Sequence, residues 1–222
     1  EENTILIFFS DHGDNFCYRE GGVHKFTCHE ESIRIPLLIL WPKKIKPGIV
    51  IEEMVGLEDL APTILDWAQV DHPDYLQGFS LVPLLEGEKT IWREVYVVQN
   101  RTVEDKIEQR CIRTDKWKLV LNDWPLVING YTGLYKWPHS KIKENSLNLL
   151  YNLEDDPEEE LNLYYAPIED IHNRYRHIPP HSEKIIELAN LLKEYSKDID
   201  DRFGCEVAEK AIMEMRSRKK KS

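Results

Sequence analysis

Cysteine and long apolar runs are scarce in this sequence, and it has no excess of positive charge. Its 222 residues include four cysteines, at positions 17, 28, 111 and 205, and their spacing matches neither a zinc finger nor a disulfide framework. We therefore expect reduced thiols or isolated core residues. No apolar run approaches the roughly 18 residues of a membrane span, so none is predicted. The formal net charge of -11 argues against a general nucleic-acid partner, which would need a basic face.

The two ends of the sequence say little about localisation. The start, Glu1-Glu2-Asn3, does not resemble a signal peptide, which leaves the localisation open because the true N-terminus need not be this one. The basic residues at 216–221 could contact an anionic surface, but a solvated terminus is the interpretation we favour.

An apolar run ends abruptly in polar residues near the start of the chain. Residues 4–9 read Thr-Ile-Leu-Ile-Phe-Phe, which predicts a strand buried on both faces, as in a parallel sheet. Ser10, Asp11, His12 and Gly13 follow at the strand end, where open α/β sheets collect ligands. Asp11 and His12 could both bind one cation if Gly13 allows a sharp bend. An ordinary turn, with Asp11 bonding its own backbone, is the alternative.

A long polar loop joins this strand to a second apolar run at 36–41. Loops above about 12 residues are usually functional or disordered, so this one is more than a connection. Its charged and histidine side chains are Asp11, His12, Asp14, Arg19, Glu20, His24, Lys25, His29, Glu30, Glu31 and Arg34. We expect His29, Glu30 and Glu31 to fix the loop by hydrogen bonds.

Several short motifs, in order and at consistent spacing, resemble the sulfatases of the alkaline phosphatase superfamily. The resemblance covers roughly residues 3–165. The motifs are Ser10-Asp11-His12-Gly13, Gly22-Val23-His24-Lys25, Glu30-Glu31-Ser32-Ile33-Arg34-Ile35-Pro36-Leu37, Asp59-Leu60-Ala61-Pro62-Thr63, Gly78-Phe79-Ser80-Leu81, Ile112-Arg113-Thr114-Asp115-Lys116-Trp117-Lys118-Leu119 and Leu150-Tyr151-Asn152-Leu153-Glu154-Asp155-Asp156-Pro157-Glu158.

The resemblance implies a site that cleaves sulfate esters. Asp11 and His12 take the places of two family metal ligands, with His12 where Asn or Gln is more usual. Calcium is the favoured divalent metal, while a nitrogen ligand leaves manganese or zinc open. Lys25 matches the lysine that contacts a sulfate oxygen. His24 either gives a proton to the leaving oxygen or holds the loop.

The nucleophile segment of the family is absent from this sequence. None of the four cysteines begins a Cys-x-Pro-x-Arg segment, whose Cys or Ser becomes the formylglycine that attacks sulfur. We therefore expect a C-terminal portion of a sulfatase that is inactive alone and whose partner is an N-terminal half or another chain. A phosphomonoester or phosphonate monoester hydrolase is the alternative enzyme. A non-catalytic subunit is a third interpretation. Such a subunit would expose an apolar sheet edge and dimerise, so a homo-oligomer also stays open.

The predicted fold class is α/β: part of a mixed, mainly parallel sheet flanked by helices, followed by a small antiparallel sheet with a packed helix. Residues 1–88 are predicted to form the α/β part and residues 89–222 the α+β subdomain. The first part has expected strands at 4–9, 36–41 and 49–55, a helix at 57–68 and a helical turn at 81–85.

The second part has expected strands at 95–98, 109–113, 117–121 and 149–153, with a hairpin turn at 114–116. A helix at 183–199, capped by Ser182, and a last helix at 205–216 complete it. Trp117 and Tyr151 are expected to pack the small sheet, and Asp59 to anchor a loop.

Overall fold

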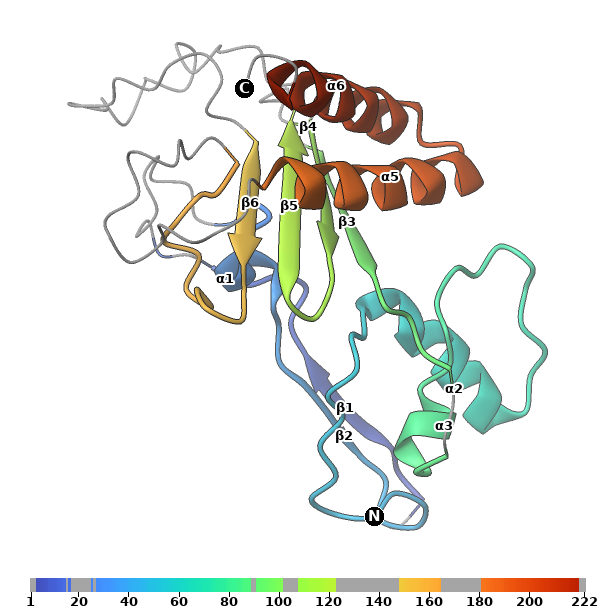
Figure 1. Cartoon of the computed structure of the whole chain (residues 1–222). Coiled ribbons are helices and arrows are strands. Elements are labelled where there is room, and N and C mark those ends of the chain that lie inside the picture. The colour runs from blue at the N-terminus through green and yellow to red at the C-terminus, as the bar shows by residue number, and fades with distance from the viewer. Residues whose placement is uncertain are drawn as a thin grey trace, which may run out of the picture. The chain divides into compact units, whose positions relative to one another are not determined.

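The computed structural model describes residues 3–14, 16, 25, 27–88, 91–101, 108–122, 148–164 and 181–219 (Figure 1). The chain divides into two compact units. The first unit comprises residues 1–13 and 34–94, and the second comprises residues 14–33 and 95–222. Within the described ranges, no helix is both long and apolar enough to cross a membrane.

The first unit is built on a two-stranded ribbon. Strand β1 (Leu6–Phe9) pairs antiparallel with β2 (Leu37–Leu40). Ile7 and Ile39 face each other across the ribbon and join a core with residues of α2 (Leu60–Ala68) and α3 (Val82–Leu85). The prediction of a strand buried on both faces is wrong for this chain. Its outer face lacks a covering layer, because the described part of the first unit supplies apolar partners to one face alone.

A buried carboxylate ties together the loops of the first unit. Asp59, at the end of η1 (Leu57–Asp59), accepts hydrogen bonds from the backbone N–H groups of Gly56 and Phe79, each at 2.8 Å. The Arg93 guanidinium donates to both carboxylate oxygens, at 2.6 and 2.8 Å. Gly78 is required here, because a Cβ on it would lie 2.0 Å from the Glu58 carbonyl oxygen. These contacts confirm the prediction that Asp59 anchors a loop.

The predicted strand at 49–55 is wrong. This segment has no strand, and no described strand lies beside it to complete a ladder of hydrogen bonds. Ile51 and Val55 instead pack directly against the core of the first unit. The apolar residues at 49–55 therefore indicate burial in the core and not pairing with a neighbouring strand.

The second unit contains an antiparallel sheet in the order β3-β4-β5-β6. Its strands are β3 (Tyr96–Arg101), β4 (Glu108–Arg113), β5 (Trp117–Asn122) and β6 (Leu149–Asn152). Helices α5 (Ser182–Asp198) and α6 (Arg202–Lys219) pack on one face, which we call the helix face (Figure 1). The predicted strands and both helices are confirmed. The predicted Ser182 cap is wrong, because α5 begins at Ser182 itself and His181 precedes it without a side-chain cap.

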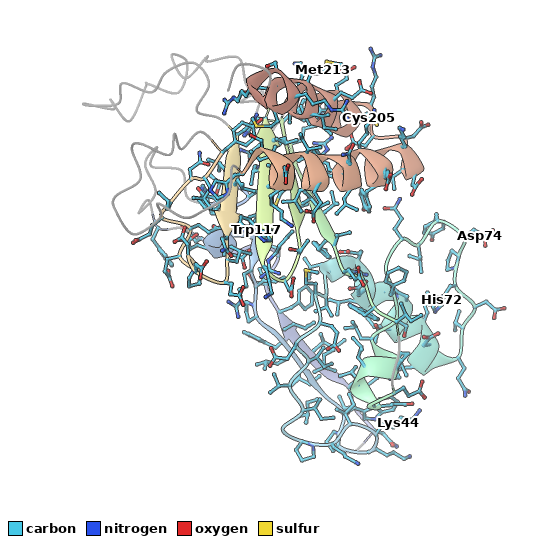
Figure 2. All side chains as sticks on the ribbon, viewed as in Figure 1. Lys44, His72, Asp74, Trp117, Cys205 and Met213 are labelled. Atoms are coloured by element: carbon cyan, nitrogen blue, oxygen red, sulfur yellow. The ribbon has the colours of Figure 1, made fainter. Side chains whose placement is uncertain are left out.

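Alternation along the strands places a closed apolar core on the helix face. Leu119, Leu121 and Ile112 are fully buried there against Leu188 and Leu192 of α5. Trp117, labelled in Figure 2, packs against the same core, and Lys184 Nζ lies 5.6 Å from the centre of its ring. The prediction that Trp117 packs the small sheet is thereby confirmed.

The opposite face, which we call the loop face, presents three rows of side chains across the strands. Paired residues define each row. The first row is Tyr96, Arg113, Lys118 and Tyr151; the second is Val98, Cys111, Val120 and Leu149; the third is Asn100, Gln109 and Asn122. The short helix α1 (Glu30–Ile33) and the residues before it, 27–29, contact this face. The four-residue helix was not predicted.

Candidate functional site: an Asp–His pair and an anchored lysine segment

The carboxyl end of β1 brings Asp11 and His12 together. His12 Nε2 lies 3.4 Å from Asp11 Oδ2, and the His12 backbone N–H donates to Asp11 Oδ1 at 3.1 Å. Ser10 Oγ donates to the His12 carbonyl at 2.7 Å, which tightens the same bend. The Asp11 side chain is 82% exposed and that of His12 38%. The pair therefore presents an oxygen and a nitrogen side by side toward solvent.

The tautomer of His12 suits metal binding. His12 Nδ1 lies 2.8 Å from the Gly13 carbonyl oxygen, and a carbonyl can only accept, so Nδ1 carries the proton. In the neutral ring, Nε2 then offers its lone pair on the side of Asp11. Backbone carbonyls commonly orient metal-binding histidines in this way. The 3.4 Å between the two donor atoms also suits neighbouring ligands of one cation, given bonds of about 2.0–2.6 Å.

Two ligands alone make a partial site. Among the residues that the structure describes, no group of three or more His, Cys, Asp or Glu side chains could hold a metal ion. Hard cations take about six donors, so the remaining ligands would have to come from elsewhere. Asp11 and His12 fit a metal as one edge of its coordination shell.

Of the two site residues predicted in the loop, Lys25 and His24, the structure describes one. Lys25 belongs to the second unit, and its side chain is exposed. His24 lies outside the described residues. The structure brings Asp11 and His12 together within the first unit, whereas their union with Lys25 and His24 in one site stays a prediction.

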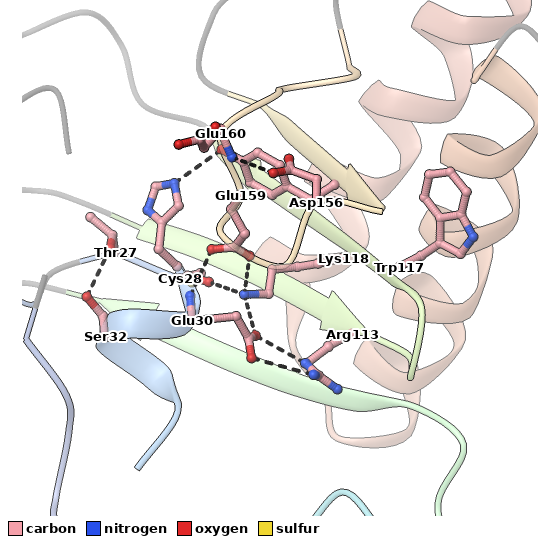
Figure 3. Close-up of polar contacts among 12 residues, drawn as sticks. Thr27, Cys28, Glu30, Ser32, Arg113, Trp117, Lys118, Asp156, Glu159 and Glu160 are labelled. Carbon is pink, nitrogen blue, oxygen red and sulfur yellow. Dashed lines mark hydrogen bonds and ion pairs between the residues drawn. The ribbon is translucent and has the colours of Figure 1, made fainter. Parts of the chain in front are cut away.

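The segment that follows Lys25 is fixed to the loop face by a buried lysine. Lys118 on β5 is fully buried, and its Nζ lies 2.6 Å from Glu30 Oε1 and 2.5 Å from Glu159 Oε1 (Figure 3). The same Nζ donates to the Cys28 carbonyl at 3.1 Å. Arg113 Nε donates to Glu30 Oε1 at 3.1 Å, and the Glu30 backbone N–H donates to Glu159 Oε2 at 2.8 Å. We call Glu30, Arg113, Lys118 and Glu159 the Lys118 cluster.

Further contacts spread this attachment over consecutive residues. His29 Nε2 lies 3.2 Å from the Tyr151 hydroxyl, and Thr27 Oγ1 lies 3.1 Å from Ser32 Oγ. Cys28 is buried among Cys111, Val120 and Val98, and the described cysteines, 28, 111 and 205, are free thiols. The prediction that His29 and Glu30 fix the loop by hydrogen bonds is confirmed, as is the packing of Tyr151 in the sheet.

The pKa values of the two carboxyl groups in the Lys118 cluster are shifted in opposite directions. Burial disfavours the charged form of Glu30, but Lys118 and Arg113 outweigh it and lower the pKa of this carboxyl. Burial, together with repulsion from the negative Glu30, raises the pKa of Glu159 by more than Lys118 lowers it. Burial by itself lowers the pKa of Lys118, yet nearby Cys111, Glu159 and Glu30 raise it overall. Glu159 is therefore the member most easily neutralised by acid.

Sequence reasoning missed Lys118 and Glu159. Lys118 stands in the predicted strand Trp-Lys-Leu-Val-Leu, where a lysine between apolar residues predicts the solvated face of a sheet. Glu159 follows Asp155-Asp156-Pro157-Glu158, an acidic turn that reads as surface. No local signal could pair them, because 40 residues separate them and the loop that covers both comes from residues 27–33.

Solved structures define the class of fold first. The chain superposes with a TM-score of 0.66 and 27% identity on a protein solved in complex with its substrate D-glucosamine-2-N,6-O-disulfate, covering 90% of this chain and 35% of that one. It also superposes on a phosphonate monoester hydrolase from Silicibacter pomeroyi with a TM-score of 0.63 and 21% identity, covering 89% and 35%, which shows the fold alone. The fold is the α/β fold of the alkaline phosphatase class.

Sequence relatives then define the family. The profile of the family "N-sulphoglucosamine sulphohydrolase, C-terminal" matches residues 20–125. An N-acetylglucosamine-6-O-sulfatase of Bacteroides thetaiotaomicron is 31% identical over 206 residues, covering 90% of this chain and 31% of that protein. An ulvan-active sulfatase of Formosa agariphila is 29% identical over 178 residues, covering 75% and 34%. The chain thus corresponds to the C-terminal portion of the sulfatase family, as its motifs indicated, and spans about a third of these relatives.

Proposed function

We propose that this chain is the C-terminal portion of a sulfuric ester hydrolase. In it, Asp11 and His12 hold a divalent cation and Lys25 contacts an oxygen of the sulfuryl group. The observation that carries the proposal is the Asp–His pair at the end of β1, with His12 Nδ1 bonded to the Gly13 carbonyl and Nε2 beside Asp11 Oδ2. A sulfatase relative that matches 90% of this chain supports it.

The chemistry of sulfate esters requires positive charge around the reacting group. A bound divalent cation, calcium by preference with manganese or zinc open, would neutralise the sulfuryl oxygens. Lys25 adds a mobile point charge for one of those oxygens. His24 gives a proton to the leaving oxygen or holds the loop. The formylglycine nucleophile would belong to the N-terminal portion of the complete enzyme, so this chain by itself should not turn over substrate.

Metal binding tests the Asp–His pair directly. We expect calorimetry to show weak binding of calcium or manganese to this chain, because two side-chain ligands are too few for tight binding. Binding should disappear in Asp11→Ala. Asp66→Ala is the matched control, since Asp66 Oδ1 also contacts a histidine, His72, at 2.8 Å in the same unit. Nanomolar affinity, or equal loss in both variants, would contradict the assignment.

Turnover tests the reaction in a complete enzyme, meaning this chain joined to a sulfatase N-terminal portion. Sulfated N-acetylglucosamine and an aryl sulfate should be hydrolysed, and Lys25→Ala should lower the rate about a hundredfold with little change in melting temperature. Lys43→Ala and Lys44→Ala are controls that should keep the rate. An alternative, hydrolysis of phosphate or phosphonate monoesters, is favoured by the Silicibacter neighbour and would appear as preferred turnover of an aryl phosphonate.

The exposed apolar outer face of the β1–β2 ribbon supports the proposal of a partner chain. Leu6, Phe8 and Leu38 are 59%, 58% and 65% exposed, and Leu40 is 51% exposed beside them. Because the chain spans about a third of its relatives, we assign this face to contact with the N-terminal portion. Co-purification of that portion, lost in Leu38→Glu, is the expected result. A homodimer through the same face, seen by sedimentation, would favour the third interpretation, a non-catalytic subunit.

A further inference from the structure

We propose that Glu159 and Lys118 are positioning residues for Lys25. They hold residues 27–33 in one arrangement on the loop face, and this arrangement sets where the preceding lysine enters the site. The inference rests on the proposed role of Lys25 in sulfate binding. It assigns a task to the Lys118 cluster, which has no part in the Asp–His pair or in the chemistry described above.

The cluster grips the backbone of the segment as well as its side chains. Lys118 Nζ donates to the Cys28 carbonyl at 3.1 Å, and Glu159 Oε2 accepts from the Glu30 backbone N–H at 2.8 Å. These two contacts fix the main chain at points two residues apart, three and five residues after Lys25. Because the main chain is held at both of these residues, it has little freedom to shift along the sheet.

Three oxygen atoms surround the buried ammonium group of Lys118. Nζ donates to the Cys28 carbonyl oxygen and lies within ion-pair distance of Glu30 Oε1 and Glu159 Oε1. A fully buried ammonium that lost one of these partners would be strongly penalised, because it has no access to water. A displaced segment would remove two of the three partners together, those of Cys28 and Glu30, so the displaced state is disfavoured.

Glu159 is aimed at the sheet by its own turn. The Asp156 carboxylate accepts from the backbone N–H groups of Glu160 and Leu161, each at 2.9 Å. Within this turn Glu159 adopts φ 54°, a left-handed conformation that side chains other than glycine rarely adopt. A cost of this kind persists where surrounding contacts determine the residue, often at functional sites. The turn thus delivers one carboxylate that reaches both Lys118 and Glu30.

Stability alone does not require these charges. Well-packed apolar residues often replace a buried ion network at no loss, or with a gain. A polar network adds conformational specificity, because its hydrogen bonds form in one arrangement of the segment only. Cys28 would still pack against the apolar row of Cys111, Val120 and Val98, so the cluster selects the register of the segment rather than the burial of Cys28.

Hydrogen exchange on this chain tests the anchoring. In Glu159→Ala we expect amides of residues 27–33 to exchange about tenfold faster or more, since the acceptor of the Glu30 backbone N–H and an ion-pair partner of Lys118 are both lost. The amides of β4 and α5 should keep their protection, which shows that the unit is still folded. Glu154→Ala is the matched control, because Glu154 pairs with the exposed Lys116. Unchanged exchange at 27–33 would overturn the proposal.

Kinetics of the complete enzyme test the positioning. Glu159→Ala should lower kcat for a sulfate ester between about ten- and a hundredfold, since small misplacements cost this much. The loss should vanish when Lys25 is already alanine, whereas a general structural defect would add to it. Additive losses, or full activity in Glu159→Ala, would overturn the proposal. An enzyme without sulfate turnover would refute the proposed function instead, and the exchange result would still decide the anchoring.

Discussion

The two sheets of this protein differ in how much of their apolar side-chain surface is exposed to solvent. In the second unit, Leu119 and Leu121 are fully buried beneath the α5–α6 pair, and the opposite face carries the segment 27–33. In the first unit, Leu38 and Phe8 are as apolar, yet they are 65% and 58% exposed on the outer face of the ribbon. Similar strand sequences thus reach opposite degrees of burial.

The difference lies in how many layers the described chain supplies. The second unit provides a cover for each face of its sheet, so its core closes on itself. The first unit provides α2 and α3 for one face of a two-stranded ribbon, an element that is marginal alone. The second unit should therefore behave as an independent folding unit, and the ribbon should depend on a partner. The following changes probe this contrast.

Removing the buried cation should give the largest effect. Lys118→Met leaves Glu30 and Glu159 buried without their shared partner, and breaking such a network typically costs about 3–5 kcal/mol. Urea unfolding followed by helical circular dichroism measures this loss. Lys116→Met, which removes a neighbouring exposed ion pair, should leave the unfolding midpoint unchanged. A midpoint for Lys118→Met equal to wild type would show that the loop face needs no ionic anchor.

Truncating the helix-face core should come next. Leu188 on α5 is fully buried against the sheet, and Leu→Ala changes at such sites cost about 2–5 kcal/mol through lost burial and a cavity. We expect the lower half of that range, because helix α6 beside it can shift to fill part of the space. A change below about 0.5 kcal/mol in urea unfolding would mean that the second unit is not closed.

Acid should weaken the second unit in a defined order. The pKa of Glu159 is raised, so as pH falls toward its usual 4.5 this residue takes up a proton in the folded state first, and stability rises slightly. The pKa values of Glu30 and Asp201 are lowered, for Asp201 by Arg110 acting against burial, so their contributions are lost as the pH falls below about 4.5 for Glu30 and about 3.8 for Asp201.

Each of these groups changes stability by at most about 1.4 kcal/mol per pH unit. Urea titrations between pH 7 and pH 3 should therefore show a maximum in the mildly acidic range. Glu159→Gln should flatten the limb above pH 4.5 and leave the steep acid limb in place. If the free energy of unfolding of the wild type fell steadily from pH 7 to pH 3, these pKa directions would be contradicted.

Substitution on the ribbon's outer face should have the smallest effect. Leu38→Ser removes an exposed side chain, so the unfolding of this chain should change by less than about 0.5 kcal/mol. Ile39→Ser, one residue along the same strand, faces the core of the first unit and is the matched comparison. Equal destabilisation by both would show that the outer face is covered within this chain, and the contrast between the two units would fail.

The sequence alone determined much of the local structure and the family. Strong periodicity predicted α2, α5, α6 and the strands of the second unit, because long stretches with regular burial leave a clear pattern. The Asp-His-Gly bend after an apolar run indicated Asp11 and His12 as neighbours, since adjacent residues need no tertiary contact to meet. Resemblance supplied the role of Lys25, which stays a prediction.

Only the tertiary structure decided which apolar faces are buried and which charges meet. The residues of β1 predicted burial on both faces, but burial depends on a second layer that a strand sequence cannot specify. Glu30 was expected to fix only its own loop, and Lys118 and Glu159 look solvated in their own segments. They become one buried cluster because hairpin pairing, the turn at Asp156 and the packing of α1 bring three distant segments to one row of the sheet, and such long-range contacts leave no trace in local pattern.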